Sequence, residues 1–228
     1  MVERSTEQVG ATPTAQQSAA RGAAQWRYVE ELVAERPEAQ AARRHSIEAG
    51  IEPVSATVGA QLAQLAAASA ATQIVEIGTG FGVSALWLLT GAPDASITSI
   101  DTEVEYQQAA RDALVEAGFA PARVRMITGT ASAVLPKMND GSYDLVLVDA
   151  DPATVIEYVE HGLRIARPGG TVAVARALQH GRVADPARRD EVTSAYRALI
   201  TEVAASDAVV SSLSTAGDGL LLLTKRGA

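Results

Sequence analysis

The spacing of apolar residues changes near residue 72 of this 228-residue chain. Before that point they recur every three or four positions, which predicts helices at about residues 25–35, 38–49 and 55–68. Pro37 separates the first two helices, and Gly50-Ile51-Glu52-Pro53 separates the last two. Residues 1–23 are mostly Ala, Gln, Thr, Ser and Gly, which favours an unstructured tail. We therefore expect a tail over 1–23 and one domain over 24–228, with helices at 24–70 and a core at 72–228.

Beyond residue 72, continuous apolar runs alternate with helical patterns, which predicts a parallel sheet covered on both faces. The expected strands are 73–77, 96–100, 123–128, 145–148 and 171–174. The expected helices between them are 83–90, 104–117, 131–138 and 154–166. A long helix at 186–205 precedes two last strands, 208–213 and 220–224, whose short link predicts an antiparallel hairpin. The pattern predicts an α/β fold with a seven-stranded, mostly parallel sheet.

Composition narrows the class of protein. Hydrophobic residues are 47% of the chain, enough for a large buried core, and the net charge of -8 argues against general nucleic-acid binding. The absence of cysteine excludes disulfides and a thiolate metal site. There is no apolar run of transmembrane length and no apolar leader, so we expect a cytoplasmic protein that does not span a membrane.

A glycine-rich turn, Val75-Glu76-Ile77-Gly78-Thr79-Gly80-Phe81-Gly82, joins the first core strand to a helix. Such turns bring backbone N–H groups and a helix N-terminus close to a nucleotide-like ligand. The spacing differs from the Gly-x-Gly-x-x-Gly of dinucleotide sites, whereas Asp101 at the next strand end suits the ribose of NAD and of S-adenosylmethionine equally. Glu76 would repel a pyrophosphate but suits the amino group of a methionine tail. Together with the C-terminal hairpin, this favours S-adenosylmethionine.

With these features the chain resembles the cation-dependent O-methyltransferase family, which includes catechol and caffeoyl-CoA O-methyltransferases and small bacterial enzymes. The resemblance runs from about residue 43 to the C-terminus. It rests on the glycine turn with Ser84 and Trp87-Leu88, and on Thr98-Ser99-Ile100-Asp101, Tyr143-Asp144-Leu145-Val146-Leu147-Val148-Asp149-Ala150-Asp151, Arg167-Pro168-Gly169-Gly170, Gly181-Arg182-Val183-Ala184-Asp185 and Gly217-Asp218-Gly219-Leu220. It implies a Rossmann-like class I methyltransferase (EC 2.1.1.-) that uses S-adenosylmethionine, releases S-adenosylhomocysteine and forms a homodimer.

The resemblance also implies roles for particular residues. Those that would hold the donor are Val54 in a covering loop, Glu76, Gly78 and Thr79 at the methionine moiety, Ser84 at its carboxylate, Asp101 at the ribose, Thr130 and Ala131 beside the adenine, and Asp149. The family usually has Asp where Thr130 stands. Asp149 lies where the family places a residue that touches both donor and metal.

The family's metal site is altered in this chain. Relatives bind Mg²⁺ or a similar ion through the first Asp of the strand-4 motif and an Asp-Asn pair after strand 5. Here the pair is Ala175-Arg176, and Pro152 replaces a lysine proposed as the general base in relatives. Alanine offers no ligand and a guanidinium cannot coordinate a cation, so we expect no catalytic metal.

Two roles stay open for Arg176. It would either hold an acceptor beside Asp149 and Asp151, as a substitute for the charge of the ion, or only pair with these aspartates. His180 is the histidine to test as a base. We expect S-adenosylmethionine-dependent O-methylation of a small hydroxylated or carboxylated acceptor without a divalent metal. The alternatives are a catalytically silent S-adenosylmethionine-binding regulator and, against the acidic charge, methylation of a tRNA base.

Overall fold

The computed structural model describes residues 14–227, and the chain divides into two compact units, Met1–Ala34 and Glu35–Ala228. In the first unit, α1 (Ala15–Leu32) is an 18-residue helix. The expectation of an unstructured segment is therefore wrong for residues 15–23, because their alanines, glutamines and arginine are good helix formers. Residues 1–13 lie outside the described residues. The boundary between the two units falls at residue 34, and the expected single domain over 24–228 stays a prediction.

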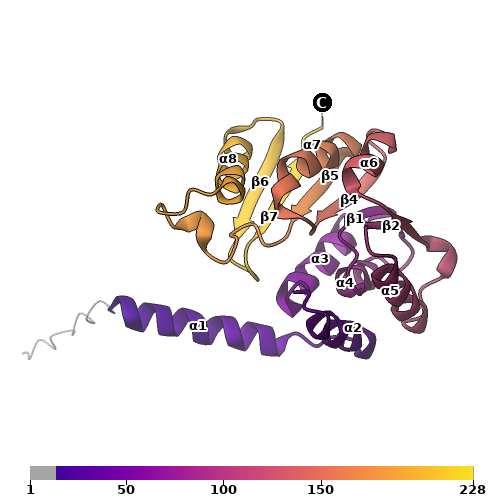
Figure 1. The fold of residues 1–228 in the computed structure, drawn as a ribbon, viewed down its shortest axis with the longest axis horizontal. Helices are drawn as coiled ribbons and strands as arrows, with labels where there is room; N and C mark the ends of the chain where they lie inside the picture. Colours follow the sequence, from indigo (N-terminus) through magenta and orange to yellow (C-terminus); the bar gives the residue numbers. More distant parts are fainter. Residues whose placement is uncertain (1–13, 228) are drawn as a thin grey trace, which may run out of the picture. The chain divides into compact units, whose positions relative to one another are not determined.

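The second unit contains the predicted sheet (Figure 1). Its seven strands follow the order β3-β2-β1-β4-β5-β7-β6, with parallel pairing from β3 to β5 and antiparallel pairing of β7 with both β5 and β6. The strands are β1 (Gln73–Ile77), β2 (Ser96–Asp101), β3 (Val124–Thr128), β4 (Tyr143–Val148), β5 (Ala166–Val174), β6 (Val209–Ser214) and β7 (Leu220–Lys225). The predicted mostly parallel sheet with a C-terminal antiparallel hairpin is confirmed.

Helices cover both faces of this sheet (Figure 1). One layer consists of α2 (Pro37–Glu48), α3 (Ala56–Ala68), α4 (Val83–Gly91) and α5 (Val104–Glu116), which pack on one another. The other consists of α6 (Ala131–Val134), α7 (Val155–Ile165) and α8 (Glu191–Ala205). Alternate residues of the central strands, among them Val75, Val146 and Val172, form a buried core with this second layer. Strands buried on both faces explain why their sequences are almost continuously apolar.

Three elements differ from the prediction for local reasons. The helix expected over 131–138 is the short α6 followed by a 3₁₀ turn, Leu135–Lys137, because Pro136 lacks the N–H that would continue the helix. The helix expected from residue 186 begins at Glu191, where the Asp190 carboxylate accepts a hydrogen bond of 3.1 Å from the Thr193 N–H. Strand β5 starts at Ala166 rather than Thr171, and its pairing with β4 shifts register between Tyr143 and Leu145.

The strand order reverses direction between β1 and β4. The chain leaves β1 through α4 toward β2 on one side, whereas β4 lies on the other side of β1. In sheets of this kind, a crevice opens beyond the carboxyl ends of the two diverging strands, and ligands bind there. This edge carries the candidate site. None of the helices within residues 14–227 is long and apolar enough to cross a membrane.

Candidate active site

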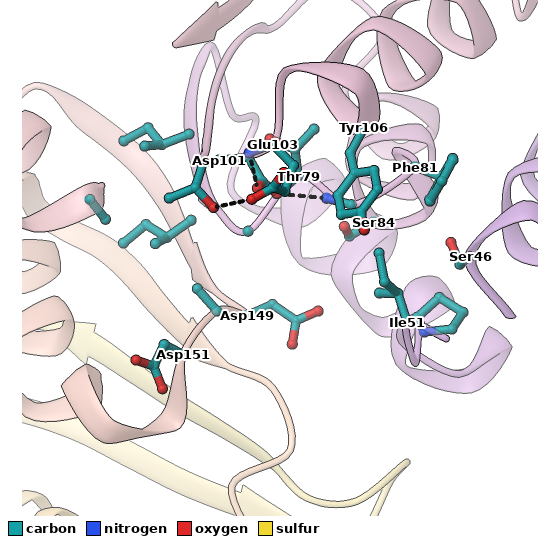
Figure 2. A pocket seen from close by; sticks show the side chains of 18 of the residues that line it. Ser46, Ile51, Thr79, Phe81, Ser84, Asp101, Glu103, Tyr106, Asp149 and Asp151 are labelled. Carbon is teal, nitrogen blue, oxygen red and sulfur yellow. Dashed lines mark hydrogen bonds between the residues drawn. The ribbon is translucent and has the colours of Figure 1, made fainter. Parts of the chain in front are cut away.

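A cavity of about 490 Å³ lies at this carboxyl edge (Figure 2). Its wall is formed by the glycine turn after β1, the ends of β2, β3 and β4, and the segment between α2 and α3. In Figure 2, Asp149 and Asp151 lie on one side of the cavity, and Ser46 and Ile51 lie on the other. The segments that the sequence marked as a ligand site are thus brought together around one space.

The glycine turn fits closely against the end of β4. Gly78 has a φ of +94°, and a Cβ atom there would lie 2.1 Å from the carbonyl oxygen of Asp149. Only glycine is compatible with this approach. The Asp101 carboxylate accepts hydrogen bonds from the backbone N–H groups of Thr79 (2.8 Å), Gly80 (3.0 Å) and Glu103 (3.0 Å). Asp101 therefore braces the turn as well as lining the cavity, and its remaining lone pairs can still accept hydroxyl donors.

Glu76 lies behind the cavity wall rather than on it. Its side chain is fully buried, and its two oxygens accept hydrogen bonds of 2.5 Å from the Ser84 and Ser99 hydroxyls. Burial raises the pKa of Glu76 to about 8, against the lowering effect of the two hydroxyl donors. Ser84 does line the cavity. The Ser84 hydroxyl therefore lies between the cavity and the Glu76 carboxylate, and the expected contact of Glu76 with the donor stays a prediction.

The other residues expected at the donor lie on the wall: Val54, Gly78, Thr79, Thr130, Ala131 and Asp149. Val54 is buried in the segment between α2 and α3. Phe81 and Tyr106 also line the cavity, with their ring centroids 4.9 Å apart. Sequence reasoning missed this aromatic pair, although aromatic residues are only 4% of the chain and each could have been examined.

A smaller cavity of about 150 Å³ adjoins the first. The two share Glu52, Asp149, Ala150, Asp151 and Arg176 on their walls. The smaller cavity continues toward the loop after β5 and toward α8, where its remaining polar wall residues are Gln179, His180 and Tyr196. This arrangement provides one space for a large ligand and a second for a small one, with Asp149 and Arg176 between them.

Arg176 connects three segments of the chain. Its Nη2 atom forms an ion pair with Asp149 Oδ1, and its Nη1 atom donates a 2.9 Å hydrogen bond to the carbonyl oxygen of Glu52. Its φ of +53° is unusual for a residue with a side chain. Burial raises the pKa of Asp149 to about 6, although the guanidinium acts in the opposite direction. The expected proximity of Arg176 to Asp149 is confirmed.

Asp151 does not share this ion pair. Its Oδ1 atom accepts a 3.0 Å hydrogen bond from the Ala153 N–H, at the start of the 3₁₀ turn Pro152–Thr154. Asp151 is exposed and lines both cavities, so its carboxylate remains accessible. Among the residues that the structure describes, the carboxylate that Arg176 pairs with is Asp149 alone.

The donor atoms at this position do not fit a divalent cation. Ala175 supplies no ligand, and the guanidinium of Arg176 already pairs with the Asp149 carboxylate. Within residues 14–227, no three His, Asp or Glu side chains are grouped as they would be around a metal ion. The side chain of Arg176 therefore lies beside Asp149, the residue that the resemblance implies as a metal ligand.

His180 lies at the rim of the smaller cavity. Its ring is 65% exposed, with Nε2 3.6 Å from Glu52 Oε2 and Nδ1 3.7 Å from Asp218 Oδ2, while its backbone N–H donates to Asp218. Tyr196, which sequence reasoning missed, is only 3% exposed at the inner end. Burial raises the pKa of Tyr196 to about 12, so its hydroxyl stays protonated. The apolar spacing of α8 could have placed Tyr196 on the buried face but not at a cavity.

Known proteins resemble this chain over almost its whole length. The sequence model of the O-methyltransferase family matches residues 27–226. A protein of Mycobacterium sp. (strain JLS), provisionally named an O-methyltransferase, is 41% identical over 199 residues, which are 87% of this chain and 90% of the relative.

Two solved structures share the fold. A protein of Corynebacterium glutamicum has a TM-score of 0.83 at 28% identity, over 92% of this chain and 98% of the other. The second is the O-methyltransferase TomG of Streptomyces achromogenes, which is involved in tomaymycin synthesis and was solved in complex with S-adenosylmethionine. It has a TM-score of 0.77 at 29% identity, over 90% of this chain and 96% of TomG. The chain therefore belongs to the O-methyltransferase family.

Proposed function

We propose that this protein is an S-adenosylmethionine-dependent O-methyltransferase that methylates a small hydroxylated or carboxylated acceptor without a catalytic divalent cation. Membership of the O-methyltransferase family supports the reaction, and the complex of TomG with S-adenosylmethionine supports the donor. The observation that carries the metal-independent part is the ion pair between Arg176 and Asp149 at the family's metal position.

The larger cavity suits the donor in size and in chemistry. A volume of about 490 Å³ lies within the range of pockets for ligands of this class. Asp101 would accept the ribose hydroxyls, and Thr130 and Ala131 would border the adenine. Ser84 would face the methionine end with the buried Glu76 behind it, and the ammonium group of the donor would favour an ionised Glu76. Bound there, S-adenosylmethionine supplies a methyl group on a positively charged sulfur.

The protein's own contribution is mainly orientation. Methyl transfer is an in-line displacement, and holding two reactants in near-attack geometry can supply much of the rate. Asp149 and Arg176 stand between the two cavities, where the acceptor oxygen would meet the methyl group. Arg176 would supply the positive charge that an ion supplies in metal-dependent relatives. His180, at the rim, is a candidate base, although its exposure leaves it open to solvent.

Two experiments test this function. Calorimetry with S-adenosylhomocysteine should show binding, and Asp101→Ala should weaken it. Formation of S-adenosylhomocysteine from S-adenosylmethionine with phenolic and carboxylic acceptors should then proceed in EDTA. Binding without turnover over a broad acceptor panel would favour the silent regulator instead.

A homodimer and a cytoplasmic location, both expected from the sequence, remain proposals. Light scattering on the purified chain should give twice the monomer mass of 23.6 kDa. A monomeric mass at micromolar protein concentration would contradict the homodimer.

A further inference from the structure

The charges around the smaller cavity are unbalanced. Its wall carries three carboxylates, from Glu52, Asp149 and Asp151, and one guanidinium, from Arg176. His180 is the remaining titratable group that can be cationic on this wall. The carboxylates therefore outnumber the cations whether or not His180 is protonated. The electrostatic potential inside the smaller cavity is therefore negative.

The positive charge of Arg176 is already engaged within the protein. Asp149 Oδ1 pairs with Nη2, and the Glu52 carbonyl accepts from Nη1. An acidic acceptor would have to compete with a buried Asp149 for this guanidinium. It would also approach the exposed carboxylates of Glu52 and Asp151, and like charges brought together cost free energy.

Tyr196 brings a hydroxyl group to the wall of this cavity. Its side chain is 3% exposed and lines the cavity from α8. A phenol on a cavity wall offers its hydroxyl to a molecule that enters the cavity. Because burial keeps this phenol protonated, it can both donate to and accept from a neighbouring hydroxyl.

We propose that the smaller cavity is the acceptor subsite and selects hydroxyl compounds that carry no acidic group, with the Tyr196 hydroxyl positioning the acceptor and Asp151 accepting a hydrogen bond from one of its hydroxyl groups. The proposal rests on the proposed function and narrows its acceptor class, since it excludes carboxylated acceptors. Tyr196 is a positioning residue, because it holds the acceptor without exchanging a proton with it.

Three probes with the same dihydroxyphenyl ring test the selection by charge: catechol is neutral, 3,4-dihydroxybenzoate is anionic, and dopamine is cationic. Calorimetry on the protein saturated with S-adenosylhomocysteine measures their affinities without any need for turnover. We expect 3,4-dihydroxybenzoate to bind at least about tenfold more weakly than catechol and dopamine. Equal or tighter binding of the benzoate would overturn the proposal, and so would the absence of binding by all three at millimolar concentration. Failure of methyl transfer alone would instead contradict the proposed function.

Variants separate the contribution of the negative charge from that of the Tyr196 hydroxyl. Asp151→Asn keeps the oxygen that accepts the hydrogen bond from Ala153 but removes one negative charge. The difference in affinity between catechol and 3,4-dihydroxybenzoate should therefore become smaller. Asp207→Asn removes the same charge where β6 begins, at the opposite edge of the sheet, and should leave the preference unchanged. An equal response to both substitutions would contradict a local origin of the selection.

Tyr196→Phe keeps the buried ring and removes only the hydroxyl. We expect the Kd for catechol to rise about three- to tenfold, which corresponds to one neutral hydrogen bond, with an unchanged Kd for S-adenosylhomocysteine. Tyr143→Phe, at the start of β4 on the opposite edge, is the matched control and should change neither. An unchanged Kd for catechol in Tyr196→Phe would contradict the claim that the Tyr196 hydroxyl positions the acceptor.

Discussion

Replacing Arg176 by methionine removes the cation beside Asp149 and keeps a side chain of comparable reach. The side chain of Asp149 is only 9% exposed, and burial raises its pKa to about 6 even with Arg176 present. Breaking a buried pair leaves an uncompensated charge, which typically costs about 3–5 kcal/mol. Arg176 is 26% exposed, so water reaches part of the site. We therefore expect the free energy of unfolding at pH 8 to fall by about 3 kcal/mol, the lower end of that range.

The size of this loss depends on pH. The folded-state pKa of Asp149 lies above its ordinary value of 3.8, so the stability associated with its neutral form is complete below pH 3.8 and is lost as the pH rises through about 6. Without Arg176, the pKa of Asp149 rises further. At pH 5 the carboxyl group of Arg176→Met is then protonated, and the variant should unfold with almost the free energy of the parent protein.

Urea denaturation followed by circular dichroism at pH 5 and pH 8 measures both values. Arg182→Met is the matched control, since Arg182 pairs with Asp190 at 2.9 Å on the surface, where such pairs contribute at most about 1 kcal/mol. Adding Asp149→Asn to Arg176→Met should recover most of the loss at pH 8. An equal loss at both pH values, or a loss no larger than that of the control, would refute this account of the pair.

Three further predictions concern other carboxylates and the glycine turn. Because the pKa of Glu76 is raised to about 8, the stability that its neutral form contributes is complete below pH 4.5 and is lost as the pH rises through about 8. In scanning calorimetry, Glu76→Gln should therefore raise the Tm at pH 9 more than at pH 6. Equal increases in Tm at both pH values would contradict the burial of Glu76 as a neutral acid. Gly78→Ala would place a Cβ 2.1 Å from the Asp149 carbonyl oxygen, so titration calorimetry should find no binding of S-adenosylhomocysteine; parent-like affinity would disprove the close approach. Asp144 accepts from the Thr72 and Gln73 N–H groups at 2.7 and 2.8 Å, and its pKa is lowered to about 2, against desolvation, by these hydrogen bonds and by Arg167. Asp144→Asn should lower the free energy of unfolding at pH 7 by about 1.5–3 kcal/mol, and the difference should disappear as the pH falls from 3.8 through about 2, while cofactor affinity stays unchanged.

The sheet was predictable from the sequence because its central strands are buried on both faces. Val146 and Leu147, for example, point to opposite sides and are both apolar, which produces a continuous run that is easily distinguished from helical spacing. The glycine turn and the acids at strand ends also located the larger cavity, because parallel strands end at one edge. The extent of α1 was not predictable, since its N-terminal part has helix-forming residues but few apolar ones.

The smaller cavity was only partly predictable. Asp149 and Arg176 follow adjacent strands, so their meeting could be expected from the strand order. Glu52 meets Arg176 across 124 residues of sequence, and Tyr196 enters from α8, whose position depends on the packing of the whole second helical layer. The place of Glu76 beside the glycines was visible in the sequence, but its hydrogen bonds to Ser84 and Ser99 depend on how α4 and β2 pack against β1.

The dependence of methyl transfer on Mg²⁺ tests the central claim most directly. The rate of S-adenosylhomocysteine formation with catechol is measured on protein treated with EDTA, and then with increasing Mg²⁺ in excess of the chelator. If Arg176 supplies the charge at the acceptor, the chelated protein turns over and the rate stays flat across the titration. A chelated protein that is inactive and regains its rate as Mg²⁺ is added would contradict the account.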